Sequence, residues 1–221
     1  IYDTLLGMDS SYQPRPQMAD WTVSDDGLVY RFTLREGLTF HDGAPVTAAD
    51  CVASLRRWAE RDAGGQMMME HAASLEAEGD DTIVLTLEQP FTYVAELLAK
   101  PSSVPAFIMP ERIANTPSTE AIGEHVGSGP FRFVADAFQP GVQAVYEKFA
   151  EYRPRDEPPS WTAGGKTVNV DRVVWVAMPD AQTAISALMG GEIDFMEAVP
   201  TDLLPILSLI HISEPTRPLY I

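Results

Sequence analysis

The amino-acid sequence predicts an α/β fold, and three stretches support that prediction. Between residues 28 and 50, an alternating strand leads through two turns to the start of a helix. Residues 82–87 are a β-rich run bounded by turn residues. Between residues 173 and 195, an apolar strand, a helix and a short second strand follow one another. This is the order of a βαβ unit, so strands and helices are expected to alternate.

Composition narrows the class of protein. The 221 residues suffice for one large or two small domains, and 45% hydrophobic with 21% charged residues is ordinary for a globular protein. The net charge of −17 and the pI of about 4.4 argue against nucleic-acid or anionic-membrane binding, since both need basic surface. No apolar run reaches the roughly 18 residues of a membrane span. Cys51 is the single cysteine, so no intrachain disulfide forms and we expect it to be a small buried hydrophobe.

The first strand is indicated by strict alternation. The sequence SDDG at 24–27 predicts a turn. Tyr30, Phe32 and Leu34 then alternate with polar residues, which is the period of a half-buried strand. Residues 38–40 are expected to resume strand structure after a glycine.

A helix is predicted directly after this hairpin region. Thr47 and Asp50 have the spacing of an N-terminal capping pair. Leu55 and Trp58 lie on one side of the helix and charged residues lie mostly on another. The glycines within residues 61–66 are expected to end it.

Later elements follow from the same signals. Residues 82–87 predict a strand, 91–99 a short helix, and 131–134 with 144–147 an antiparallel pair. Met67, Met68 and Met69 allow two interpretations, an adaptable binding surface or simple core filling, and composition favours the second.

The C-terminal third is expected to contain the βαβ unit. The Pro- and Gly-rich residues 153–167 predict an irregular loop. Residues 173–177 are a nearly continuous apolar run, typical of a strand buried on both faces. Asp180 is expected to cap a helix through Met189, and residues 193–195 to form the next short strand.

Residues 21–50 closely resemble a signature of extracytoplasmic solute-binding proteins of peptide/nickel-type ABC transporters, also called family 5. The matching positions are Trp21, Ser24, Asp26, Gly27, Tyr30, Phe32, Leu34, Arg35, Gly37, Phe40, Asp42, Gly43, Pro45, Thr47, Ala48 and Asp50. Two later motifs of that family also match, in order and spacing. They are Gly127 to Phe131, and the set Pro179, Asp180, Thr183, Ala187, Leu188, Gly191, Glu192, Ile193 and Asp194. The resemblance covers residues 1 to about 206.

This resemblance implies an α/β, periplasmic-binding-protein-like fold of type II with an extra small domain. Residues 1–8 and 128–206 would form part of lobe I, and residues 9–127 the small α+β domain. The second lobe would be missing. The N-terminus is expected to be an internal segment of a longer protein, because it shows no signal peptide and its residues resemble an internal family segment.

The function implied by the resemblance is substrate binding for an ABC importer. A peptide or similar small solute would be captured between lobes in the periplasm and delivered to an inner-membrane permease, by a protein expected to be monomeric. No cofactor, metal site, catalytic residue or nucleic-acid partner is expected.

The resemblance also implies candidate ligand-binding residues. Family loops corresponding to residues 64–68 and 100–104 reach the cleft, which points to Gly65, Gln66, Met67, Ser102 and Ser103. Relatives often carry an aromatic residue in the first loop, and this chain does not. The ligand class therefore stays open at this point.

Residues 207–221 resemble something different, the in-frame translation of a transposon end and sequencing adapter. We expect this tail to be non-native and exclude it from the prediction of the fold.

An enzyme is the alternative class, for instance a metal-dependent hydrolase using His41 or His125 with acidic partners. The histidines are scattered singly, with no metal-ligand spacing, and the sequence Gly127-Ser128-Gly129 lacks the spacing of a nucleophile elbow. A binding protein is therefore the favoured prediction.

Overall fold

The computed structural model describes residues 1–205, which divide into two compact units. The first unit contains Ile1–Asp136 and Val145–Val173, and the second contains Ala137–Ala144 and the described chain from Val174 onward. The predicted division into residues 1–8 with 128–206, and 9–127, stays a prediction. The predicted non-native tail, residues 207–221, lies outside the described residues.

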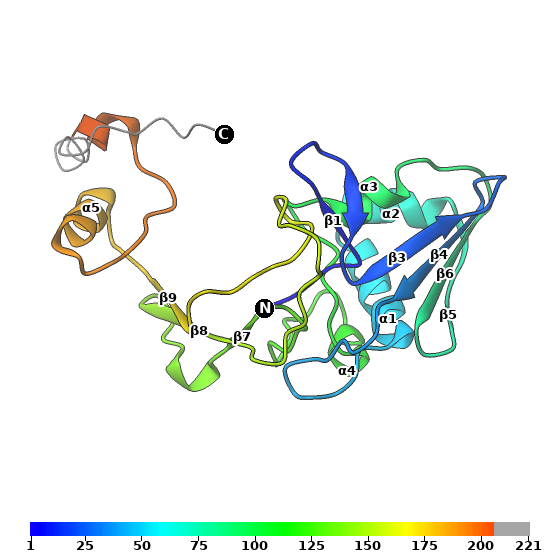
Figure 1. Cartoon of the computed structure of the whole chain (residues 1–221), viewed down its shortest axis with the longest axis horizontal. Helices are drawn as coiled ribbons and strands as arrows, with labels where there is room; N and C mark the ends of the chain where they lie inside the picture. The colour runs from blue at the N-terminus through cyan, green and yellow to red at the C-terminus, as the bar shows by residue number, and fades with distance from the viewer. Residues whose placement is uncertain (206–221) are drawn as a thin grey trace. The chain divides into compact units, whose positions relative to one another are not determined.

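The first unit is built on a four-stranded antiparallel sheet in the order β3-β4-β6-β5 (Figure 1). Its strands are β3 (Ala19–Val23), β4 (Val29–Leu34), β6 (Thr82–Leu87) and β5 (Ala72–Glu78). In this register Phe32 lies opposite both Trp21 and Ile83. The predicted strands at 30–34 and 82–87 are confirmed, and β5 is a strand that was not predicted.

Alternation along β4 and β6 builds the core. Tyr30, Phe32 and Leu34 are buried, and so are Ile83 and Leu85 on the neighbouring strand. Helix α1 (Ala48–Ala59) packs on β5 and β6. The buried face of the sheet and the apolar face of α1 therefore share one hydrophobic core.

The predicted capping pair of α1 is confirmed. The Thr47 N–H donates to Asp50 Oδ2 at 2.8 Å, and the Asp50 N–H donates to Thr47 Oγ1 at 3.4 Å. Cys51 is fully buried in α1, as predicted, and burial raises the pKa of its thiol.

One prediction about this region is wrong, and a second is only partly correct. Residues 38–40 form no strand; Thr39 makes only one bridge, to Pro45, and a proline has no N–H with which to continue the ladder. The helix after Thr47 does end just before residues 61–66, but its C-cap is Glu60 and not a glycine, and the glycines belong to a second helix, α2 (Ala63–Glu70).

The first unit also contains a short hairpin of β1 (Leu6–Met8) and β2 (Pro14–Pro16), and the helices α3 (Val94–Ala99) and α4 (Glu111–Ala114). Helix α3 confirms the predicted helix at 91–99, with a start three residues later. No helix in residues 1–205 is both long and apolar enough to cross a membrane.

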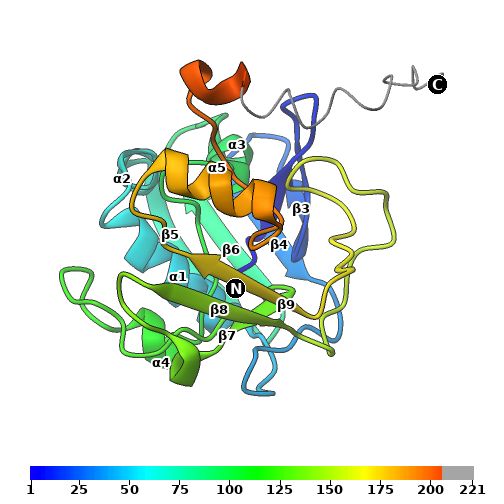
Figure 2. The same cartoon turned by 90° about the vertical axis from the view of Figure 1, so that its left-hand side faces the viewer.

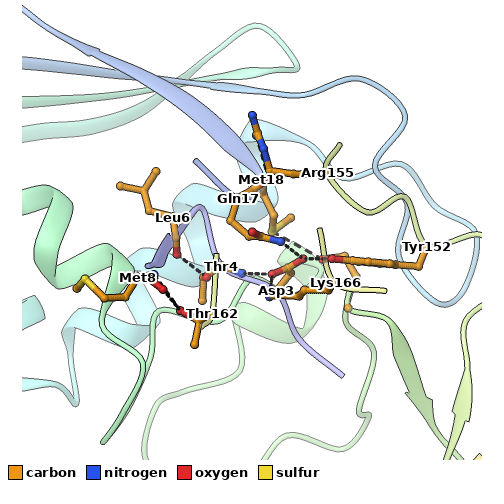
Figure 3. Close-up of polar contacts among 12 residues, drawn as sticks. Asp3, Thr4, Leu6, Met8, Gln17, Met18, Tyr152, Arg155, Thr162 and Lys166 are labelled. Atoms are coloured by element: carbon orange, nitrogen blue, oxygen red, sulfur yellow. Dashed lines mark hydrogen bonds and ion pairs between the residues drawn. The ribbon is translucent and has the colours of Figure 1, made fainter. Parts of the chain in front are cut away.

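A buried carboxylate fastens residues 152–166 to the start of the chain (Figure 3). Asp3 is 1% exposed and pairs with Lys166 Nζ at 2.6 Å, where the lysine is 28% exposed. The Tyr152 hydroxyl donates to the other Asp3 oxygen at 3.0 Å, and the Thr4 N–H donates to the first at 3.1 Å. Burial, with the negative charge of Asp3, raises the pKa of Tyr152. The predicted irregular loop at 153–167 is thus held in place by buried polar contacts.

Three non-glycine residues among those described have positive φ: Tyr12 at 60°, Ser103 at 64° and Trp161 at 51°. Such a backbone costs about 1–3 kcal/mol per residue. The Tyr12 and Trp161 rings meet edge to face with centroids 5.3 Å apart. An aromatic contact of this kind returns about 0.5–1.5 kcal/mol, which is less than the combined strain of the two residues.

A second sheet has the order β7-β8-β9 (Figure 2). Its strands are β7 (Phe131–Phe133), β8 (Gln143–Lys148) and β9 (Arg172–Val176), and a short 3₁₀ helix η1 (Ala135–Ala137) follows β7. The antiparallel pairing of β7 with β8, with Arg132 opposite Glu147, confirms the predicted pair.

The predicted βαβ unit is only partly correct. Helix α5 (Ala181–Gly190) is present, and the Asp180 side chain caps it by accepting from the Thr183 N–H at 2.9 Å. However, residues 193–195 form no strand, since the described residues offer them no strand partner. Strand β9 is not buried on both faces either: the side chains from Val174 to Val176 are exposed among the described residues. A 3₁₀ helix, η2 (Thr201–Leu203), follows.

Candidate functional site

The two segments that the sequence assigns to the ligand lie close together in the first unit. Gly65, Gln66 and Met67 are in α2, and Ser102 and Ser103 are in the loop after α3. Helices α2 and α3 are neighbours (Figure 1), and a Cβ on Gly64 would lie 2.5 Å from a Leu97 methyl group. We call these segments, residues 62–68 and 100–104, the candidate ligand surface.

The first segment is helical, not the predicted loop. Asp62 is the N-cap of α2 and accepts from the Gly65 N–H at 3.0 Å. A Cβ on Gly65 would lie 2.7 Å from Ala59 Cα and 3.1 Å from the Trp58 ring. The glycine therefore permits α2 to pack tightly on the end of α1. The sequence alone predicted a helix stop here and did not reveal this packing.

One carboxylate joins the two segments. Asp62 is 7% exposed and pairs with the ammonium of Lys100, which is 22% exposed. Burial raises the pKa of Asp62, but hydrogen bonds from Lys100 and the Gly65 N–H outweigh burial and hold that pKa below its usual value. The same carboxylate thus stabilises the start of α2 and anchors the loop after α3.

Trp58 also holds the loop after α3 in place. Its indole Nε1–H donates to the Val104 carbonyl oxygen at 2.7 Å, and its ring lies 5.8 Å from the Lys100 ammonium. The loop between these two anchors contains Ser102 and the strained Ser103, both exposed. Strained backbone is kept only where its surroundings fix it, and it concentrates at ligand-binding loops.

The exposed side chains among the five candidate ligand residues carry no charge. Gln66, Ser102 and Ser103 are exposed, and Met67 is 50% exposed. Met68, the next residue, is fully buried in the core. The methionine run therefore contributes both to the core and to the exposed surface. The Asp62–Lys100 ion pair is the part of the site that the sequence did not reveal.

A cleft of the first unit lies away from the candidate ligand surface. Its volume is about 570 Å³, and it is lined by α1, β5, α4 and residues 115–118. None of the five candidate ligand residues lines it. Its two arginines already donate to backbone carbonyls: Arg56 to Leu75 and Arg57 to Thr116.

The geometry gives the hydrolase alternative no support. His41 uses both ring nitrogens, with Nε2 2.9 Å from the Gly129 carbonyl and Nδ1 accepting from the Gly127 N–H at 3.3 Å. Burial lowers the pKa of His41, so it stays neutral in this turn. His125 packs edge to face on Phe133. Within residues 1–205 no three His, Cys, Asp or Glu side chains gather as a metal site would require.

Comparison with known proteins decides the family. The family model described as bacterial extracellular solute-binding proteins, family 5 (middle region), matches residues 13–213. The chain belongs to this family. The family 5 resemblance predicted from residues 21–50 and the two later motifs is thereby confirmed.

Individual relatives agree with this assignment. A probable peptide ABC transporter periplasmic-binding protein (y4tO) of Sinorhizobium fredii is 49% identical over 210 residues, which are 94% of this chain and 39% of the relative. The glutathione-binding protein GsiB of Salmonella typhimurium is 30% identical over 212 residues, 94% of this chain and 38% of the relative. This chain therefore spans about two fifths of the length of these relatives.

A solved structure of a periplasmic binding protein confirms the fold. The periplasmic binding protein DppA from Helicobacter pylori, in complex with the peptide STSA, superimposes with a TM-score of 0.73 and 27% identity. The match covers 95% of this chain and 43% of DppA. The predicted periplasmic-binding-protein-like α/β fold is correct, and the chain corresponds to part of such a protein.

Proposed function

We propose that the complete protein containing this chain is the substrate-binding component of an ABC importer. It captures a peptide in a cleft between two lobes and delivers it to a membrane permease. The observation that supports this most is the 49% identity to a probable peptide-transporter binding protein across nearly the whole chain. The periplasm, a monomeric state and the absence of catalysis belong to the same proposal.

The candidate ligand surface fits a peptide backbone. Gln66, Ser102 and Ser103 offer amide and hydroxyl groups, and Met67 offers an adaptable apolar side chain. None of these side chains is charged, so they suit the uncharged backbone of a peptide better than its charged ends. The anchors for the ends of the peptide would then come from other parts of the complete protein.

Closure supplies the delivery signal in this proposal. A ligand shifts an open–closed equilibrium only by its differential affinity for the two states. A peptide that touches this surface and a second lobe at the same time makes more contacts in the closed form. The permease would then distinguish loaded from empty protein by shape.

Calorimetry on the complete protein tests the proposal. We expect a panel of short peptides, with glutathione included because of the GsiB relative, to contain a ligand that binds one per protein and stays intact. Met67→Ala should weaken that binding by about three- to tenfold, as expected for loss of one apolar contact. Met189→Ala is the matched control, because Met189 on α5 is equally exposed, at 49% against 50%.

One result would contradict the proposed function, and another would contradict only the placement of the ligand site. Cleavage of the peptide would indicate an enzyme. Equal affinities of Met67→Ala and the control would remove α2 from the ligand site while leaving the binding function intact.

A further inference from the structure

An exposed pair of aromatic side chains has no role in the site described above. Tyr12, at the tip of the β1–β2 hairpin, is 72% exposed, and Trp161, in the loop after β8, is 55% exposed. Neither belongs to the hydrophobic core, and neither lines the cleft of the first unit. We call the two residues the aromatic corner.

The aromatic corner is held rigidly although its halves are far apart in sequence. The Ser160 hydroxyl accepts from the Ser10 N–H at 3.1 Å and lies 3.2 Å from the Ser10 hydroxyl. The Thr162 hydroxyl accepts from the Met8 N–H at 2.8 Å, and the Thr162 N–H donates to the Met8 carbonyl at 3.0 Å (Figure 3). Both neighbours of Trp161 are therefore tied to the hairpin, and Ser10, two residues before Tyr12, is tied to the loop of Trp161.

The conformation of the aromatic corner works against stability. Both Tyr12 and Trp161 have positive φ, and the strain of the two exceeds the gain from their edge-to-face contact. Glycine would adopt the same backbone without strain. The edge-to-face contact alone thus does not offset the backbone strain, and most of the surface of both rings stays available to a partner.

Chemistry indicates the kind of partner. Exposed, preorganised Trp and Tyr side chains are typical interface hot spots, because little side-chain freedom is lost when they bind. Their ring faces are electron-rich and attract Lys or Arg side chains. The net charge of −17 disfavours anionic partners and favours a basic protein surface.

We propose that Tyr12 and Trp161 form an anchor by which the protein docks on the membrane permease, with basic side chains of the permease over the two rings. This inference rests on the proposed importer function, which supplies the permease. It adds to that function a specific docking residue pair, separate from the candidate ligand surface.

The test uses the complete protein and its cognate permease complex in nanodiscs. The double variant Tyr12→Gly/Trp161→Gly removes both rings and relieves both strained backbones, so it should fold at least as stably as the wild type. We expect at least about tenfold weaker docking and permease ATPase stimulation. Peptide affinity should stay within about twofold of the wild type. Tyr93→Ala is the control, because Tyr93 is also exposed (62%) and also makes an edge contact with one ring.

A charge pair tests the basic partner directly. Trp161→Lys should dock more weakly than Trp161→Glu, and the difference should shrink in high salt. Stronger docking of Trp161→Lys than of Trp161→Glu would refute the proposal that basic side chains of the permease face the two rings.

The remaining outcomes separate this inference from the proposed function. Equal docking of the double variant and the wild type overturns the aromatic corner as an anchor and leaves the importer function standing. Loss of stability in the double variant would assign the rings a structural role and also overturn it. Acrylamide quenching can show whether Trp161 is accessible in the complete protein before the permease is added. A shielded Trp161 would also overturn the aromatic corner as an anchor. A wild-type protein that neither binds peptide nor docks refutes both proposals together.

Discussion

Lys166→Met is the substitution whose effect follows most directly from the structure. It removes the ammonium that pairs with Asp3, a carboxylate only 1% exposed. Removing one partner of a buried pair costs about 3–5 kcal/mol, because a buried charge is left unpaired. Here Lys166 is 28% exposed and Asp3 keeps hydrogen bonds from Thr4 and Tyr152. Solvent and these bonds reduce the expected loss to about 2–3 kcal/mol.

Urea unfolding of the complete protein, followed by tryptophan fluorescence, measures this loss. Asp3→Asn combined with Lys166→Met should recover at least half of it, because no unpaired buried charge remains. Lys148→Met is the control: that lysine makes one exposed hydrogen bond, to the Val168 carbonyl, so we expect less than about 0.5 kcal/mol. If Lys166→Met matches this control, or if the double variant shows no recovery, the buried network does not fasten the segment as described.

Three further predictions concern the turn at residues 127–129 and the candidate ligand surface. Burial lowers the pKa of His41 below 6.5, so at a pH just below 6.5 the unfolded chain binds a proton at this residue more readily than the folded chain does. The free energy of unfolding should therefore fall as the pH drops below about 6.5. In urea titrations at several pH values, His41→Asn should make this pH dependence shallower. Gly65→Ala should destabilise the protein by about 1–3 kcal/mol, because the added Cβ would lie 2.7 Å from Ala59 Cα of the preceding helix. Gly190→Ala, whose added Cβ would have its nearest neighbour atom at 3.8 Å, should be neutral or slightly stabilising in thermal unfolding. Equal effects of the two substitutions would refute the close approach of α2 to α1. Lys100→Met should weaken peptide binding by about tenfold in calorimetry, because it frees the loop from Asp62; an unchanged affinity would separate this ion pair from the ligand surface.

Local patterns were sufficient for the elements whose signals are local. Alternation predicted β4 and β6, and the spacing of Thr47 and Asp50 predicted the cap of α1, because period and capping chemistry depend on near neighbours. Strand β5 was missed because its sequence, AASLEAE, has helix-favouring residues and owes its conformation to pairing with β6.

The predictions were wrong where tertiary contacts determine the local structure. Gly65 was interpreted as part of a helix stop, but it serves a close helix–helix approach. The apolar run from Val173 to Val176 correctly predicted a strand, yet continuity of apolar residues does not reveal what covers them.

The candidate ligand surface was predictable only through resemblance to family 5. The motifs located residues 64–68 and 100–104, but no local pattern connects Asp62 with Lys100, which lie 38 residues apart. Their pairing depends on how α2 and α3 meet. The same holds for the aromatic corner, since Tyr12 and Trp161 come from opposite ends of the first unit's sequence.

The central claim is that the complete protein binds a peptide and does not transform it. Titration with the best peptide of the panel, followed by tryptophan fluorescence and by chromatography of the peptide after prolonged incubation, tests this most directly. We predict saturation at one peptide per protein with all of the peptide recovered intact. Recovery of cleaved peptide, or no response to any peptide from a folded protein, would contradict the claim.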